Sequence, residues 1–131
     1  MNLREITQQY HGSTLPELVE KQLKSMSEAT LLKAIRGTFD NFPNEDRELI
    51  NTFTENFLEN WFDPHILTDD LGDIFSDAVK NIQNITTQTD VLLDDERTFD
   101  VFNIMVMKLS HFAHSHPVFR KKMGIKKGRF W

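Results

Sequence analysis

The 131-residue chain contains no cysteine, which excludes disulfide bonds and thiolate metal sites. It is also poor in glycine and proline, with five and four residues, and none of them forms a Gly-rich phosphate loop or a flexible linker. No apolar run is long enough to span a bilayer, because the longest one, 99–109, contains Asp100, Asn103 and Lys108. The first residues, 1–6, lack the apolar stretch of a signal peptide. Together these absences predict a cytoplasmic protein without a transmembrane segment.

Acidic residues are absent after Asp100, and this gives the chain two different electrostatic ends. All 20 acidic residues lie at or before that position, whereas six of the 15 basic residues lie in 117–131. Residues 40–100 carry sixteen acidic residues against three basic ones, a local net charge of −13. We expect this polarity to influence which partners the protein binds.

The hydrophobic content of the chain, 39% with eleven phenylalanines, is typical of a folded globule. A chain of this length has room for one core and is too short for two. No internal repeat or low-complexity stretch divides it. We therefore predict one domain over 1–116, followed by a basic, aromatic tail over 117–131 that packs on the domain or extends from it.

Apolar residues recur at the helical spacing of three and four positions through most of the chain. The pattern is strong in 44–62 and 69–86 and weaker in 28–42, and two shorter segments near 3–10 and 15–23 also show it. No segment alternates apolar and polar residues beside an Asn-Gly or Asp-Gly turn, so a β-hairpin is not predicted.

Helix-capping residues agree with these segments. Gly12 can end the first helix in a left-handed conformation, and Thr14 with Glu17 forms a capping box for the second helix. Ser25 and Glu28 repeat the capping-box spacing, and we expect the third helix to begin there.

Breaks between the later helices are marked by proline and by polar residues. Pro43 precedes the fourth helix, and several capping signals place the start of the fifth helix somewhere in 64–70. The polar stretch 86–90 predicts a loop, and 118–123 is expected to form a last turn that Gly124 closes.

The segment from about 96 to 115 is apolar on nearly every side. A helix without a polar face is usually enclosed by its neighbours, although a short strand over 101–106 is the competing interpretation. The length of the segment and its methionines favour a helix. We therefore predict an all-α fold, a single compact bundle of five to seven helices around this hydrophobic C-terminal helix. The alternative use of its apolar surface is a homodimer interface along 99–112.

Three histidines near the end of that helix, His111, His114 and His116, form a candidate metal site. His111 and His114 are three residues apart and share a helical face, so both imidazoles could reach one metal, with His116 as a third ligand. The spacing does not match a zincin helix, which needs histidines four residues apart with an adjacent Glu. The alternative is that these histidines flank the C-terminus of a buried helix, where imidazolium interacts well with the helix dipole. The sequence therefore predicts no cofactor, with a metal at these histidines as the alternative.

Acidic side chains line one side of the predicted helix 69–86 and precede the next helix. Asp in a first helical turn stabilises the helix dipole and caps backbone amides, which explains most of these positions without a site. No nucleophile motif and no inward-facing pattern of Glu and His accompanies them, so no catalytic residue is predicted. The residues that we expect to form an acidic partner-binding face are Asp69, Asp70, Asp73, Asp77, Asp94 and Asp95.

The tail interleaves basic and aromatic residues. That pattern suits a phosphate backbone with stacked bases, or an anionic membrane surface with a Trp at its interface. The alternative is that Phe119, Met123 and Ile125 pack on the domain while the cations offset its acidic charge. The residues that would bind a partner here are Arg120, Lys121, Lys122, Lys126, Lys127, Arg129 and Trp131.

From these observations we predict a non-enzymatic module that binds or regulates another protein through its acidic helical surface, as adaptors, inhibitors and immunity proteins do. Two alternatives use other parts of the chain. The first is binding of nucleic acid or an anionic membrane through the basic tail, and the second is a metal protein that uses the three histidines.

Overall fold

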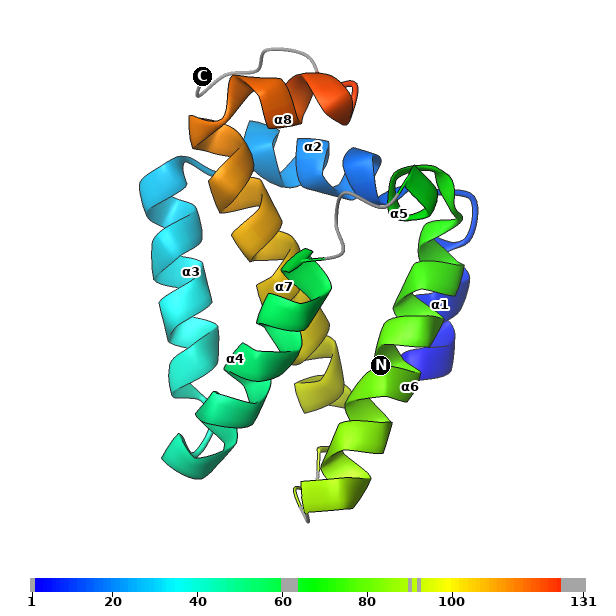
Figure 1. Ribbon diagram of the computed structural model, residues 1–131, viewed down its shortest axis with the longest axis vertical. Helices are drawn as coiled ribbons and strands as arrows, with labels where there is room; N and C mark the ends of the chain where they lie inside the picture. The colour runs from blue at the N-terminus through cyan, green and yellow to red at the C-terminus, as the bar shows by residue number, and fades with distance from the viewer. Residues whose placement is uncertain (1, 60–63, 90, 92, 126–131) are drawn as a thin grey trace.

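The computed structural model describes residues 2–59, 64–89, 91 and 93–125 (Figure 1). These residues form eight helices and no strand. The predicted all-α class is confirmed. The helix count exceeds the predicted five to seven because two short helices, before α6 and after α7, are separate elements. The helices are α1 (Leu3–Tyr10), α2 (Leu15–Ser25), α3 (Glu28–Asp40), α4 (Asn44–Glu59), α5 (Pro64–Thr68), α6 (Leu71–Thr89), α7 (Asp95–Ser115) and α8 (Pro117–Lys122).

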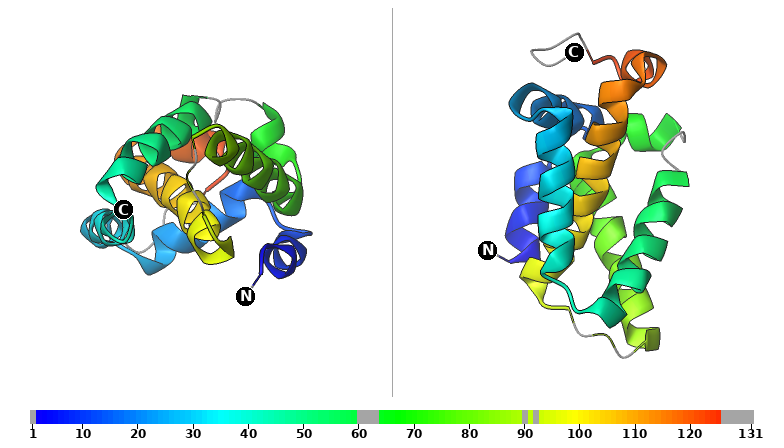
Figure 2. Two further views of the ribbon diagram at one scale, coloured as in Figure 1. Left: turned by 90° about the horizontal axis from the view of Figure 1, so that it is seen from below. Right: turned by 90° about the vertical axis from the view of Figure 1, so that its left-hand side faces the viewer.

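Helix α7 is the central element of the bundle. Figure 2 shows it with α2, α3, α4 and α6 arranged around it, and all four pack against it. Its side chains are buried on several sides, including Val101, Ile104, Met105 and Leu109, each at most 1% exposed. The alternative of a strand at 101–106 is therefore wrong, because this segment lies within a 21-residue helix enclosed by its neighbours.

Side-chain caps explain where several helices begin. Thr14 accepts a hydrogen bond from the Glu17 amide at 3.3 Å, as the capping box predicts, and Gly12 has the expected left-handed φ of 86°. The predicted start of the third helix at Ser25 is wrong. Ser25 ends α2, with its hydroxyl donating to a carbonyl of that helix, and Ser27 caps α3 by accepting from the Thr30 amide at 3.2 Å.

The long predicted helices differ from the structure at their ends. The single helix expected to begin in 64–70 is divided into α5 and α6. The loop predicted at 86–90 is wrong over 86–89, because α6 continues to Thr89. Threonine hydroxyls in this stretch donate to carbonyls one turn earlier, such as Thr87 to Gln83 at 2.7 Å, so their polarity is satisfied within the helix. Trp61 and Phe62, which were expected in the fourth helix, lie outside the described residues.

An aromatic cluster holds α1, α6 and α7 together. Phe75 of α6 is fully buried, and its ring centroid lies 5.4 Å from that of Tyr10 and 4.9 Å from that of Phe102. Both contacts are edge-to-face, which is a favourable geometry for aromatic pairs. The first part of the basic tail joins the same core, since Phe119, Met123 and Ile125 are at most 8% exposed. In the part of the chain that the structure describes, no helix is both long and apolar enough to cross a membrane.

Candidate functional site

A groove lies between α4 and α6, which both pack against α7 and both contribute side chains to the same hollows. A hollow of about 410 Å³ lies where α4 ends and α6 begins, and α5 closes this end. A second hollow of about 600 Å³ lies where α4 begins and α6 ends. A narrow apolar gap lies between them and shares Phe53 and Ile85 with the first hollow and Leu49 with the second. We call the two hollows and the gap between them the acidic groove.

Each helix contributes one continuous stripe of side chains to the acidic groove. The spacing of three and four residues within each stripe is that of one helical face, so the groove follows the length of both helices. On α4 the stripe consists of Glu45, Glu48, Leu49, Thr52, Phe53, Asn56 and Phe57. On α6 it consists of Ile74, Asp77, Ala78, Asn81, Asn84, Ile85 and Thr89.

The floor of the acidic groove is apolar. Phe53, Ile74 and Ala78 are buried, at 7%, 9% and 4% exposure, whereas Phe57 and Ile85 are half-buried and reach toward the groove. A buried floor with a half-buried upper layer can accept further apolar side chains without exposing the core. The groove is thus suited to an apolar ligand surface.

Carboxylates lie at both ends of the acidic groove. Asp69 and Asp77 line the end near α5, while Glu45, Asp46 and Glu48 line the opposite end. No lysine, arginine or histidine is found among the described residues that line either hollow or the gap between them. The groove therefore combines an apolar floor with unbalanced negative charge.

The two nearest basic residues in the sequence, Arg47 and Lys80, do not line the groove and therefore do not neutralise its carboxylates from within. Arg47 is directed toward the turn between α3 and α4, where its Nε donates to the Phe42 carbonyl at 3.1 Å. Its guanidinium also lies 3.8 Å from a carboxylate oxygen of Asp40. Lys80 is exposed on α6 and is not among the lining residues. The excess of negative charge in the groove is thus a local property of the site.

The six aspartates predicted to form one face occupy several places. Asp69 and Asp77 line the acidic groove, and Asp73 is exposed in the first turn of α6. Asp94 and Asp95 act at the start of α7, where Asp94 caps the helix by accepting from an amide of α7 at 2.8 Å and Asp95 accepts from the first amide of α1. The structure therefore brings two of the six together in the groove.

Asp70 joins α6 to the turn between α1 and α2. One carboxylate oxygen accepts from the Gly12 amide at 2.6 Å, and the other accepts from the Gly72 amide at 3.0 Å and lies 2.7 Å from Nδ1 of His11. The Gly12 amide, followed by the His11 side chain, lowers the pKa of Asp70 from its ordinary value of 3.8. These contacts assign Asp70 a structural role at a helix start.

Three side chains that could coordinate a metal lie together at the start of α6, away from the three histidines of α7. Ligand atoms of His11, Asp70 and Asp73 are within 4.8 Å of one another. Hydrogen bonds from backbone amides already engage both oxygens of Asp70, and His11 is exposed. These contacts explain the cluster through the connection of α1 to α6, without a metal.

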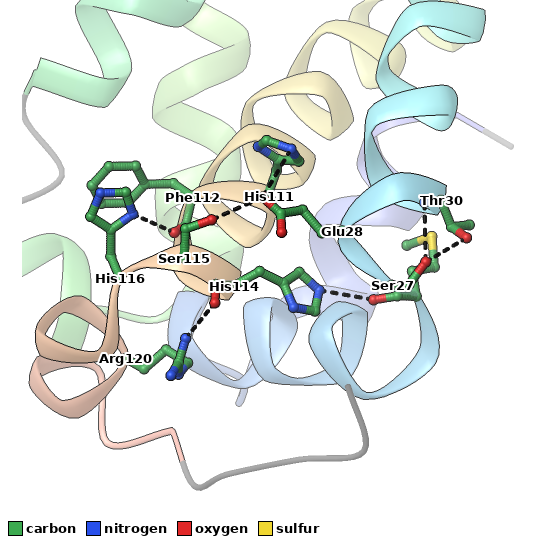
Figure 3. A network of polar contacts seen from close by, with 10 residues as sticks. Ser27, Glu28, Thr30, His111, Phe112, His114, Ser115, His116 and Arg120 are labelled. Carbon is green, nitrogen blue, oxygen red and sulfur yellow. Dashed lines mark hydrogen bonds and ion pairs between the residues drawn. The ribbon is translucent and has the colours of Figure 1, made fainter. Parts of the chain in front are cut away.

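The three histidines near the end of α7 point in different directions (Figure 3). Nε2 of His111 lies 3.7 Å from a carboxylate oxygen of Glu28, and Nε2 of His114 lies 3.0 Å from the Met26 carbonyl. His116 turns back on its own helix, with Nδ1 2.8 Å from the Phe112 carbonyl, and its ring stacks on Phe112. In the described part of the chain the three imidazoles have separate partners and do not converge on one point.

Glu28 lies between a serine and a histidine but does not form a nucleophilic triad with them. Ser115 donates to a carboxylate oxygen of Glu28 at 2.8 Å, and the same oxygen faces His111. In a Ser–His–acid triad the histidine stands between the other two and receives the proton of the serine. Here the carboxylate occupies the middle position, so the arrangement connects α3 to α7 and does not activate Ser115.

The described part of the basic tail is divided between structure and surface. Arg120 donates to the carbonyls of Ala113 and His114, which caps the C-terminus of α7, while Lys121 and Lys122 are exposed on α8. The remaining predicted tail residues lie outside the described residues: Lys126, Lys127, Arg129 and Trp131.

The α4 side of the acidic groove was not among the residues predicted to bind a partner. The structure places Glu48 beside Leu49 in the lining of the groove. A signal was present, since Glu45, Glu48 and Thr52 repeat at helical spacing along the border of the apolar stripe. Which helix faces that border could not be read from the sequence.

No protein-family model matches the chain, and comparisons with curated proteins and with solved structures found no match.

Proposed function

We propose that the chain is a non-enzymatic protein-binding or regulatory module that binds a basic segment of a partner protein in the acidic groove. The observation that carries this proposal is the combination of an apolar floor with carboxylates at both ends and no cation among the described lining residues. Phosphate-rich ligands are disfavoured here, because this surface repels anions.

Both parts of the groove contribute to binding for physical reasons. Apolar side chains of a partner gain free energy when they leave water for the apolar surface formed by Phe53, Phe57 and Ile85. The carboxylates at the rim attract cationic side chains and speed their approach, which makes the association dependent on salt. The groups that elsewhere suggest chemistry, His111 and Ser115, are connected to Glu28 in a structural network.

The proposal can be tested with a labelled, lysine-rich amphipathic peptide whose binding is followed by fluorescence anisotropy. We expect the peptide to bind the full chain and to bind more weakly as salt is raised. The double variant Glu48→Gln/Asp77→Asn removes one carboxylate from each end of the groove. It should weaken binding by about fivefold to tenfold, as expected for two partly exposed ion pairs.

The matched control is the double variant Glu5→Gln/Glu96→Gln, which removes the same charge from exposed positions outside the groove. It should change the affinity by less than about twofold. Equal weakening by both double variants would show that only net charge attracts the peptide, and that result would overturn the proposal.

A chain truncated after Ile125 tests whether the end of the tail contributes to peptide binding, because the six residues that follow contain Lys126, Lys127, Arg129 and Trp131. The proposal predicts that this truncated chain binds the basic peptide as tightly as the full chain. Loss of peptide binding on truncation would show that residues 126–131 are required for binding and would contradict the proposal.

A further inference from the structure

We infer that the occupant of the acidic groove is an amphipathic helix of about four turns, with an apolar stripe in its middle and basic residues at both of its ends. This inference rests on the proposed function. It adds the conformation of the bound segment, its length and the order of its residues.

The length follows from the two stripes that form the groove. The α4 stripe runs from Glu45 to Phe57, which corresponds to about 18 Å of helix, and the α6 stripe runs from Ile74 to Thr89, or about 22 Å. A helix that fills about 20 Å contains roughly thirteen residues. An extended segment would cover the same distance with about six residues.

The floor of the groove favours a helical occupant. Both walls are helices, whose backbone N–H and C=O groups bond within each helix, so no sheet edge is present in the described part to pair with an extended segment. An extended chain would leave backbone groups facing Phe53 and Ile85, and burying an unpaired peptide group is costly. A helix satisfies its own backbone groups and presents only side chains to the floor.

The order of residues in the occupant follows from the distribution of charge. One end of the groove carries Asp69 and Asp77, the other carries Glu45 and Glu48, and the gap between them is apolar. A complementary helix therefore has lysine or arginine near each end and leucine-type side chains between. A helix with its cations in the middle would place them over the narrow apolar gap.

The test uses three acetylated and amidated peptides of about fourteen residues with the same number of lysines and leucines. The first has lysines at both ends and a central leucine stripe at helical spacing. The second has the same arrangement of lysines and leucines but a proline in place of one other central residue, and the third has its lysines in the middle. We expect the first to bind at least about tenfold more tightly than the other two, and to gain helical circular dichroism on binding.

Occupancy of the groove is tested by filling it. Asn81 is exposed, lines the groove and lies on α6, so Asn81→Trp places a large side chain in the path of the peptide without touching the core. The matched control is Gln83→Trp, which is exposed on the same helix and does not line the groove. The first variant should weaken binding of the first peptide by about tenfold, and the control should leave it unchanged.

The outcomes separate this inference from the proposed function. If the proline peptide binds as tightly as the helical one while Glu48→Gln/Asp77→Asn still weakens both, the groove binds an extended segment and the inference is wrong. Equal affinity of the peptide with central lysines would contradict the order of residues. If no basic peptide binds, or if the groove variants have no effect, the proposed function fails and this inference fails with it.

Discussion

The Nδ1 atom of His11 lies 2.7 Å from Oδ2 of Asp70, which connects residues 59 positions apart at the start of α6. The other oxygen of Asp70 accepts from the Gly12 amide, and the Leu71 amide donates to the Ser13 carbonyl at 2.7 Å. Together these contacts fix the turn between α1 and α2 against the helix whose other face lines the acidic groove.

The carboxylate of Asp70 should make stability depend on pH in the acidic range. Its pKa is lowered from 3.8, first by the Gly12 amide and then by His11, so the folded state binds fewer protons than the unfolded state. Its stabilising contribution is complete above 3.8 and is lost as the pH falls through the lowered value. Asp70→Asn removes this titration. We expect the variant to be less stable than the wild type at pH 5 and the difference to shrink toward pH ~2.

Urea denaturation followed by circular dichroism over that pH range measures the difference. Asp70→Asn keeps one oxygen that can accept from the Gly12 amide, so the variant should still fold. A difference in unfolding free energy that stays constant from pH 5 to pH ~2 would show that the carboxylate charge at this position does not contribute.

Gly72 should not tolerate the addition of one methyl group. A Cβ at this buried position would lie 2.5 Å from Nδ1 of His11 and 2.9 Å from Oδ2 of Asp70, so the two side chains would have to separate. We expect Gly72→Ala to lower the urea midpoint with an unchanged m-value, although alanine favours helix by about 0.5–1 kcal/mol.

The matched control is Gly37→Ala in α3, where a Cβ would meet nothing within 4 Å. There the helix propensity acts alone, and we expect stability to rise by about 0.5–1 kcal/mol. If both alanine variants were stabilised to the same extent, the close contact between Gly72 and His11 would not constrain the fold.

The elements of the fold were predictable where local sequence determines structure. The capping box at Thr14, the left-handed Gly12 and the absence of a polar face along about 96–115 each depend on residues a few positions apart. Their consequences, the start of α2, the end of α1 and the enclosure of α7, agree with the prediction. The prediction of Ser25 as the cap of α3 was wrong because Ser27, two positions later, can also accept from an amide in the first turn and is the residue that does so.

The candidate site depends on contacts between segments that are distant in the sequence. The sequence pattern therefore indicated only part of it. Asp69 and Asp77, which line the groove, were among the residues expected to bind a partner, whereas no residue of α4 was, because the sequence does not reveal which helix faces are left without a neighbour. The directions in which His111 and His114 point were not predictable for the same reason. Glu28 and Met26, which lie more than 80 positions away, provide the partners of His111 and His114.

Phe75 should be among the side chains whose loss destabilises the bundle most. It is fully buried, and its ring meets those of Tyr10 and Phe102 from α1 and α7. Truncation leaves a cavity that these rings cannot fill, so we expect Phe75→Ala to lower the free energy of unfolding by about 3–5 kcal/mol. Urea denaturation measures this value, and Phe75→Leu, with a smaller loss, serves if the alanine variant does not fold.

The control for this prediction is Val118→Ala. Val118 is 70% exposed on α8, and its truncation should change stability by no more than about 0.5 kcal/mol. A loss at Phe75→Ala below about 1 kcal/mol would mean that the three rings do not form the connection between α1, α6 and α7.

Arg120 should differ from its lysine neighbour in α8 because its guanidinium caps another helix. It donates to the Ala113 and His114 carbonyls in the last turn of α7, where backbone carbonyls extend beyond the regular intrahelical hydrogen bonds. Arg120→Ala leaves these half-buried carbonyls without that donor, and we expect a loss of about 1 kcal/mol in unfolding free energy. Lys121→Ala, which removes the same charge from an exposed position, should remain within about 0.5 kcal/mol of the wild type.

A third variant separates the geometry of Arg120 from its charge. Arg120→Lys keeps the cation but replaces the planar fork by a single ammonium, which cannot bridge two carbonyls in the same way. We expect it to recover only part of the stability lost in Arg120→Ala. Full recovery by lysine would show that the interaction of a positive charge with the C-terminal dipole of α7 is sufficient, and the two directed hydrogen bonds would then contribute nothing further.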